Sequence, residues 1–312
     1  MTGETMWNNV SGKNNGRELW LDIAKAYGIF LVVINHLEIH IPLVTFFGGM
    51  FYMPVFFVAA GYTYRNKGES FQAFAANKAK RLLLPYVVCN ILLVAFYMVR
   101  AGGFSKPALL GIFYSRSMLM SAKSSWNMAL MPALNAPTWF LPCLFLCLCL
   151  YFLIDRKFTE ENKRRKVIVL AMLVGVVLRT LSPVLLPWSL ENALFFLGFM
   201  EVGRFLKETG LSWLRKNEWI YANFLLVFLT LSYMNGSVNV SISQYGRSMV
   251  LYFIVGALGS LLCMNAAELI EKHVSVLAKP LAFVGRHTLP ILCWHLFVIE
   301  IIKTILPMIG IS

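Results

Sequence analysis

Charged residues are scarce in this chain of 312 residues, and their scarcity argues against an ordinary soluble domain. Asp, Glu, Lys and Arg together make up 14% of the sequence, whereas soluble domains carry about 25%. Hydrophobic residues make up 58%, and the mean hydropathy is +0.67. A composition this apolar is typical of an integral membrane protein.

Recognisable cysteine motifs are lacking too. The six cysteines all lie in apolar runs and show neither zinc nor disulfide spacing, so we interpret them as small buried hydrophobic residues. Nothing resembles a cleavable signal peptide, because the first sixteen residues are polar. No segment repeats at a fixed period, so the inverted repeats of many transporters are not evident.

Acidic residues are few, 15 against 28 Lys and Arg, which gives a net charge of +13. In a soluble chain this balance would suggest nucleic acid as a partner. Here the basic residues fall in loops between apolar runs, so the preference of Lys and Arg for cytoplasmic loops explains them better. We therefore expect a lipid bilayer and no nucleic acid among the partners.

Apolar runs of about 20 residues, the length that crosses a bilayer, predict an all-α polytopic bundle of about nine to ten spans. The second run contains Gly48, Gly49, Pro54 and Gly61, so we expect it to be kinked or broken. The chain should hold a cytoplasmic tail (1–18) and a single membrane domain (19–312). The nine runs are 19–37, 44–64, 82–99, 138–154, 167–182, 190–206, 219–234, 248–265 and 287–306.

The distribution of Lys and Arg predicts the orientation. With the N-terminus inside, the inner segments 1–18, 65–81, 155–166, 204–218 and 266–286 hold 20 of the 28 basic residues. The outer segments 99–137 and 235–247 then hold 5, which favours a cytoplasmic N-terminus. Segment 99–137 is read as interfacial or re-entrant structure; if it crossed, there would be ten spans and every later segment would flip.

Polar side chains gather in the first run, where each costs roughly 2.5–3.5 kcal/mol on insertion scales and so marks a functional site by default. His36 is the strongest candidate among these polar residues, because an unperturbed imidazole pKa near 6.5 suits it to exchange protons at neutral pH. They are Asp22 and Lys25 near its start, and Asn35, His36, Glu38 and His40 at its end.

Several motifs, in order along nearly the whole chain, resemble the acyltransferase type 3 family of membrane proteins, in the branch of fucose O-acetylase-like enzymes. The first run has the Asp, basic residue and closing His of the family's opening motif. Lys78 stands where the family often has arginine, and His287 where Ser or Asn is usual. The other matching elements are Met53-Pro54 with Phe56, Phe57, Gly61 and Tyr62; Lys78, Arg81 and Pro85; Trp139-Phe140-Leu141; Phe195-Phe196-Leu197-Gly198; and Gly285 with His295.

The resemblance implies a membrane O-acyltransferase. Such proteins move an acyl group, usually acetyl from cytoplasmic acetyl-CoA, to a hydroxyl of a surface or exported glycan or of its lipid-linked precursor. The expected cofactor is acetyl-CoA as donor, and the expected location is the bacterial cytoplasmic membrane. The sequence does not predict an oligomeric state.

Within this reading His36 is the predicted acid/base group and Glu38 would orient it or the acceptor. Lys25 lies eleven residues, about 16 Å, before His36 on nearly the same helix face, so it is predicted to bind the donor together with Lys78 and Arg81. The alternatives stay open: His36 as a polar contact between helices, Lys25 as the ion-pair partner of Asp22, and Lys78 and Arg81 as ordinary basic flanks.

Four residues are assigned to the acceptor: Asn35, Trp139, Arg179 and His295. Trp139 has an alternative as an interfacial anchor, and His295 as a polar contact between helices. His36 and His40 have the i, i+4 spacing of a metal site, but no third ligand is evident, so we expect no metal.

A carrier or flippase that moves a lipid-linked or acylated glycan without chemistry is the rival function. The His36 motif favours the enzyme, since a carrier needs no acid/base group near a CoA site.

Overall fold

The computed structural model describes residues 18–37, 41–104, 106–116, 135–211, 214 and 218–308, and these are almost entirely helical. Their only strand-like feature is a single bridge between Asn239 and Gln244. The helices are α1 (Leu19–His36), α2 (Pro42–Phe51), α3 (Pro54–Thr63), α4 (Phe71–Ala101), α5 (Lys106–Tyr114), η1 (Ala136–Trp139), α6 (Phe140–Lys157), α7 (Glu161–Leu181), η2 (Pro187–Ser189), α8 (Leu190–Thr209), α9 (Glu218–Asn235), η4 (Val240–Ile242), α10 (Met249–His273), α11 (Ser275–Arg286) and α12 (Thr288–Met308).

Local sequence signals set several of these boundaries. The Ser70 hydroxyl accepts a hydrogen bond from the Ala73 amide and caps α4. Pro42 and Pro54 open α2 and α3, where a proline costs no helical hydrogen bond. The predicted break of the second apolar run is thus confirmed, and it falls at Tyr52 and Met53.

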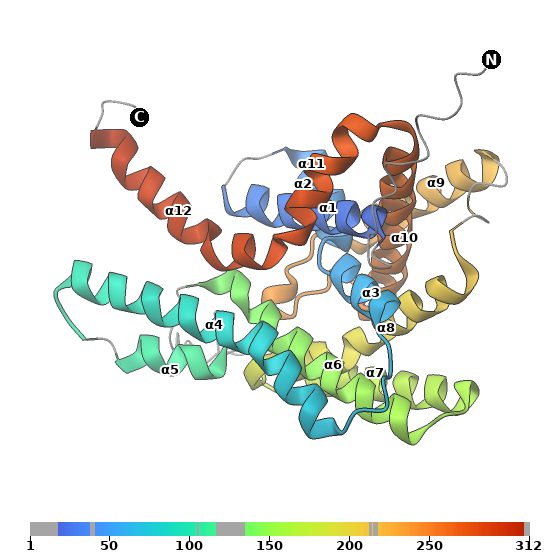
Figure 1. Ribbon diagram of the computed structural model, residues 1–312, viewed down its shortest axis with the longest axis horizontal. Coiled ribbons are helices and arrows are strands. Elements are labelled where there is room, and N and C mark those ends of the chain that lie inside the picture. The colour runs from blue at the N-terminus through green and yellow to red at the C-terminus, as the bar shows by residue number, and fades with distance from the viewer. Residues whose placement is uncertain are drawn as a thin grey trace, which may run out of the picture.

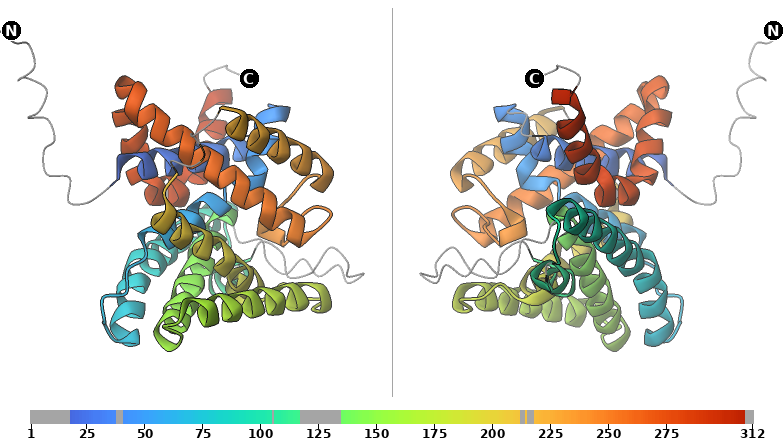
Figure 2. Two further views of the ribbon diagram at one scale, coloured as in Figure 1. Left: turned by 90° about the vertical axis from the view of Figure 1, so that its right-hand side faces the viewer. Right: turned by 90° about the vertical axis from the view of Figure 1, so that its left-hand side faces the viewer.

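The helices form two tiers, which Figure 2 shows from both ends of the molecule: α1, α2 and α9 to α12 in one, and α4 to α7 in the other. Helix α3 lies where the tiers meet (Figure 1) and contacts α1, α8 and α10. The approach of α8 to α3 requires a glycine, because a Cβ at Gly203 would collide with the Val58 carbonyl oxygen. The half-helix after the break is therefore held at the centre of the protein.

An all-helical membrane protein is confirmed by this fold, while the number of spans stays a prediction. Each of the nine predicted runs coincides with a helix or, for the second run, with α2 and α3. By length and composition, five segments among the described residues are apolar enough to cross a bilayer, and the bent pair α11 and α12 makes a sixth if it counts as one span. The predicted cytoplasmic N-terminus also stays a prediction.

The predicted inner segment 266–286 is helical, because α10 continues to His273 and α11 fills most of the rest. Hydropathy registers only the apolar part of a helix, and these turns carry Glu, Lys and Arg. In segment 99–137, predicted to be outer, the structure describes the end of α4, the short helix α5 and η1, and residues 117–134 lie outside the described part of the chain.

The six cysteines are free thiols and all are buried, as expected. The charged residues of α6 to α8 form a network at one end of these helices. Arg164 and Arg165 contact Glu201 at 3.0 and 3.3 Å, and Arg204 pairs with Asp155. Glu201 and Arg204 both belong to α8, and each pairs with a residue on a neighbouring helix, so the network joins three helices.

Candidate active site between two cavities

One stripe of α1 carries the candidate site. Lys25, Ile29, Val32 and His36 follow each other at intervals of three or four residues, which places them on one face of the helix. Lys25, Ile29 and Val32 line one cavity, and Val32 and His36 line a second. The predicted common face of Lys25 and His36 therefore borders two adjoining spaces.

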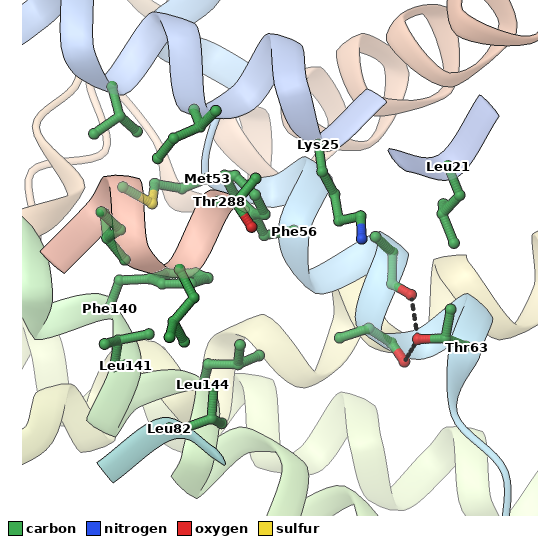
Figure 3. Close-up of a pocket in the computed structure, with 16 residues that line it drawn as sticks. Leu21, Lys25, Met53, Phe56, Thr63, Leu82, Phe140, Leu141, Leu144 and Thr288 are labelled. Atoms are coloured by element: carbon green, nitrogen blue, oxygen red, sulfur yellow. Dashed lines mark hydrogen bonds between the residues drawn. The ribbon is translucent and has the colours of Figure 1, made fainter. Parts of the chain in front are cut away.

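The first space, here the Lys25 cavity, has a volume of about 210 Å³. Figure 3 shows the Lys25 amine pointing from α1 into it, above Thr63 of α3. The rest of the lining is almost wholly apolar, from α1, α3, α4, α6 and α12: Leu21, Ile29, Val32, Met53, Phe56, Ala59, Ala60, Leu82, Phe140, Leu141, Leu144, Thr288, Leu289 and Leu292.

Lys25 also pairs with Asp22, with the amine 2.6 Å from the carboxylate. The ion pair proposed as the alternative role of Lys25 therefore exists. The Asp22 side chain is 3% exposed and that of Lys25 is 23% exposed, so the carboxylate is enclosed while the amine keeps access to the cavity. The pairing and a contact with a bound anion are compatible, since a lysine amine has three N–H donors.

Lys78 and Arg81 lie on α4 close to the same cavity. Leu82 lines the cavity, and Lys78 precedes it by one helical turn on the same face. The Lys78 amine sits 5.1 Å from the centre of the Phe74 ring, and Arg81 is exposed. Both cations thus stand near the cavity without lining it.

The second space, here the His36 cavity, has a volume of about 280 Å³ and a polar lining. Asn35 and His36 enter it from the end of α1, Thr45 and Tyr52 from α2 and the break, and Trp139 from η1. The loop between α9 and α10 closes it with Val238, Asn239 and Ser241. Val32 and Met53 belong to the lining of both cavities and are 2% and 4% exposed; they form the wall between them.

A buried ionic cluster binds the backbone of this loop. Arg116 pairs with Glu191 and donates to the Ser241 carbonyl at 3.0 Å, while the Ser243 hydroxyl binds the Glu191 carboxylate at 2.8 Å. Arg179 donates to the Ser243 carbonyl at 2.6 Å. Arg179 of α7 therefore contacts the loop that walls the cavity and is not among the lining residues.

The two histidines of the candidate site meet at the end of α1. The ring centres of His36 and His295 are 5.3 Å apart, with an angle of 49° between the rings. His36 comes from α1 and His295 from α12, so nearly the whole chain separates them in sequence. The structure brings them together beside the His36 cavity.

Comparison with protein families matches residues 18–312 to an acyltransferase domain. The chain belongs to the acyltransferase type 3 family. Neither the comparison with curated proteins nor that with solved structures found a match. The family match covers almost the whole chain, which supports membrane acyltransferase activity. The match does not identify the acyl donor, the acceptor or the branch of the family.

Of the other predicted site residues, Asn35 and Trp139 line the His36 cavity. The Asn35 amide donates to the Leu31 carbonyl at 2.9 Å, and the residue is exposed. Trp139 is 3% exposed, so within this chain it forms a cavity wall. Glu38 and His40 lie outside the described residues. Among the residues that the structure describes, no group of three His, Cys, Asp or Glu is close enough to hold a metal ion.

The sequence reading of this acyltransferase missed the wall formed by Thr45, Tyr52, Asn239 and Ser241. A signal was present in segment 235–247, whose Asn and Ser residues alternate with apolar ones. Such a pattern is unusual for a plain solvated loop, but it does not say which helix end the loop covers.

Proposed function

We propose that this acyltransferase moves an acetyl group from cytoplasmic acetyl-CoA to a hydroxyl of a surface or exported glycan or of its lipid-linked precursor. The observation that carries the proposal is the α1 stripe, with a cation in an apolar cavity at one end, an imidazole in a polar cavity at the other, and a wall of two side chains between them.

The Lys25 cavity suits the donor. Lys25 lies eleven residues from His36, a rise of about 16 Å along the helix, which is similar to the length of the pantetheine arm. With the phosphates near Lys25, Lys78 and Arg81, the thioester reaches the Val32–Met53 wall. Cations contribute charge-assisted hydrogen bonds to phosphate oxygens, and an apolar cavity keeps water away from the thioester.

The His36 cavity suits the acceptor. Sugar hydroxyls need hydrogen-bonding partners when they leave water, and this lining offers amide, hydroxyl and phenol groups. Trp139 adds an aromatic wall, against which the apolar face of a sugar ring can pack.

In the proposed reaction His36 takes the proton of the acceptor hydroxyl while that oxygen attacks the thioester carbonyl carbon. The resulting tetrahedral intermediate collapses with cleavage of the carbon–sulfur bond. The imidazolium then returns its proton to the leaving thiolate. The products are an O-acetyl ester and CoA with a free thiol, and His36 regains its neutral form.

The test uses everted membrane vesicles that contain the full-length protein, supplied with radiolabelled acetyl-CoA. We expect label in the polysaccharide or lipid-linked sugar fraction only when the protein is present. Loss of that label in His36→Gln, with label retained in His273→Gln at the exposed end of α10, would support the enzyme. Vesicles with correctly inserted protein and no protein-dependent acetylation of any fraction would favour the carrier.

A further inference from the structure

His295 stands out because one of its ring nitrogens is buried without a partner. The residue is 7% exposed. Its Nδ1 lies 3.0 Å from the Ile291 carbonyl oxygen and 3.1 Å from that of Leu292. Carbonyl oxygens only accept, so Nδ1 carries the hydrogen and Nε2 of the neutral ring presents a lone pair. Nε2 has no hydrogen-bond partner among the described residues.

The ring of His36 lies next to that of His295. With ring centres 5.3 Å apart, a nitrogen at the rim of one ring comes within hydrogen-bond reach of a facing nitrogen on the other. The structure records a tilted ring contact between them and no hydrogen bond. The bond would form if the half-buried His36 ring turned about its side-chain bond to aim an N–H at the lone pair.

Helix α12 is built to hold His295 at this place. Thr288, Leu292 and His295 share one face of α12, and the first two line the Lys25 cavity. The face of α12 thus runs beside the stripe of α1, and each ends in a histidine. The Asn135 amide, next to η1, donates to the Cys293 carbonyl at 2.9 Å and fixes this turn of α12 relative to the cavity wall.

We propose that His295 is a positioning residue for His36. Its Nε2 accepts a hydrogen bond from one nitrogen of His36, which leaves the other nitrogen unprotonated and directed at the acceptor hydroxyl. When His36 takes up the hydroxyl proton, the lone pair of His295 stabilises the imidazolium, and His295 itself stays neutral. This is the task that a third group performs for the base in nucleophile–base–orienter triads. The proposal rests on the proposed function.

Two substitutions separate positioning from a structural contact. In His295→Asn the side-chain amide still donates to the Ile291 and Leu292 carbonyls, but no acceptor remains at the ε position. In His295→Gln the amide oxygen takes the place of Nε2, and the bond at the δ position is lost. We expect His295→Asn to lower kcat for acetyl transfer about 10- to 100-fold and His295→Gln to lower it about threefold or less, with the KM for acetyl-CoA unchanged in both.

The outcomes are distinct. Transfer by the wild type tests the proposed function, and the ratio between the two variants tests the role of His295. Equal activity of the variants, or higher activity of His295→Asn, would overturn the positioning role. A second measurement places His295→Asn in the His36→Gln background: a positioning residue acts only through His36, so no further loss of residual activity is expected. An added tenfold loss there would assign His295 to a separate task.

Discussion

The two cavities share a wall and differ in almost everything else. The Lys25 cavity is apolar apart from one amine and two threonines, whereas the His36 cavity offers amide, hydroxyl, phenol and imidazole groups. One stripe of a single helix borders both. The difference indicates a division of labour: one space excludes water from a reactive thioester, and the other recognises hydroxyls. The reaction is confined to the wall where they meet.

The largest expected effect concerns the orientation of the protein: which side of the membrane Asn162 of α7 and Asn239 of the His36 cavity face. Cysteines introduced at Asn162 in the first turn of α7 and at Asn239 in the lining of the His36 cavity, both exposed, should label oppositely with an impermeant thiol reagent. In intact cells Asn239→Cys should react and Asn162→Cys should not. The native cysteines are buried and can stay in place. Reaction of both cysteines from outside would contradict the predicted orientation of the protein in the membrane.

The next effect separates chemistry from donor binding. His36→Gln should lower kcat about 10²- to 10⁴-fold, the usual contribution of a general base. The dissociation constant for acetyl-CoA should stay the same, because the donor cations lie at the other end of the stripe. Label transfer and equilibrium dialysis with acetyl-CoA measure the two quantities, with His273→Gln as control. Near-full activity of a well-inserted His36→Gln protein would make His36 a structural contact.

A smaller effect is expected at the donor end. Replacing Lys78 and Arg81 with Gln should raise the dissociation constant for acetyl-CoA about tenfold, since two cations near the phosphates are lost. Acetyl-pantetheine, which lacks the nucleotide, should lose less. The control replaces the exposed Lys67 and Lys80, which removes the same charge from the same region. Equal affinity in the two double variants would reduce Lys78 and Arg81 to basic flanks.

The smallest effect tests the acceptor end. Asn239→Ala removes one amide from the wall of the His36 cavity, and a neutral hydrogen bond is worth about 0.5–1.5 kcal/mol. At saturating acetyl-CoA, transfer to glycan should fall about three- to tenfold relative to release of free acetate. The KM for acetyl-CoA should not change. A rise in that constant would show that the two cavities do not divide donor from acceptor.

Helical periodicity and local breakers predicted the parts of this structure that depend on neighbours in sequence. The common face of Lys25 and His36 follows from their spacing, and the break before Pro54 follows from its missing N–H. Contacts between distant segments were beyond such reasoning. Asn239 reaches the His36 cavity because α9 and α10 pack beside α2, and Glu201 pairs with Arg164 because α7 lies against α8. His295 was proposed from resemblance, but its orphan nitrogen became evident only with α12 in place.

The meeting of α1 with the last two helices has a consequence for the order in which the protein is made. Helix α11 packs so tightly on α1 that a Cβ at Gly285 would collide with the Asp22 carbonyl oxygen, and α12 supplies Thr288, Leu289 and Leu292 to the Lys25 cavity. A ribosome makes α1 well before these segments. A nascent chain that already carries Lys25 and His36 thus lacks one wall of the Lys25 cavity and the partner of its base. The Lys25 cavity is therefore closed only after α12 has been made and has packed beside α1.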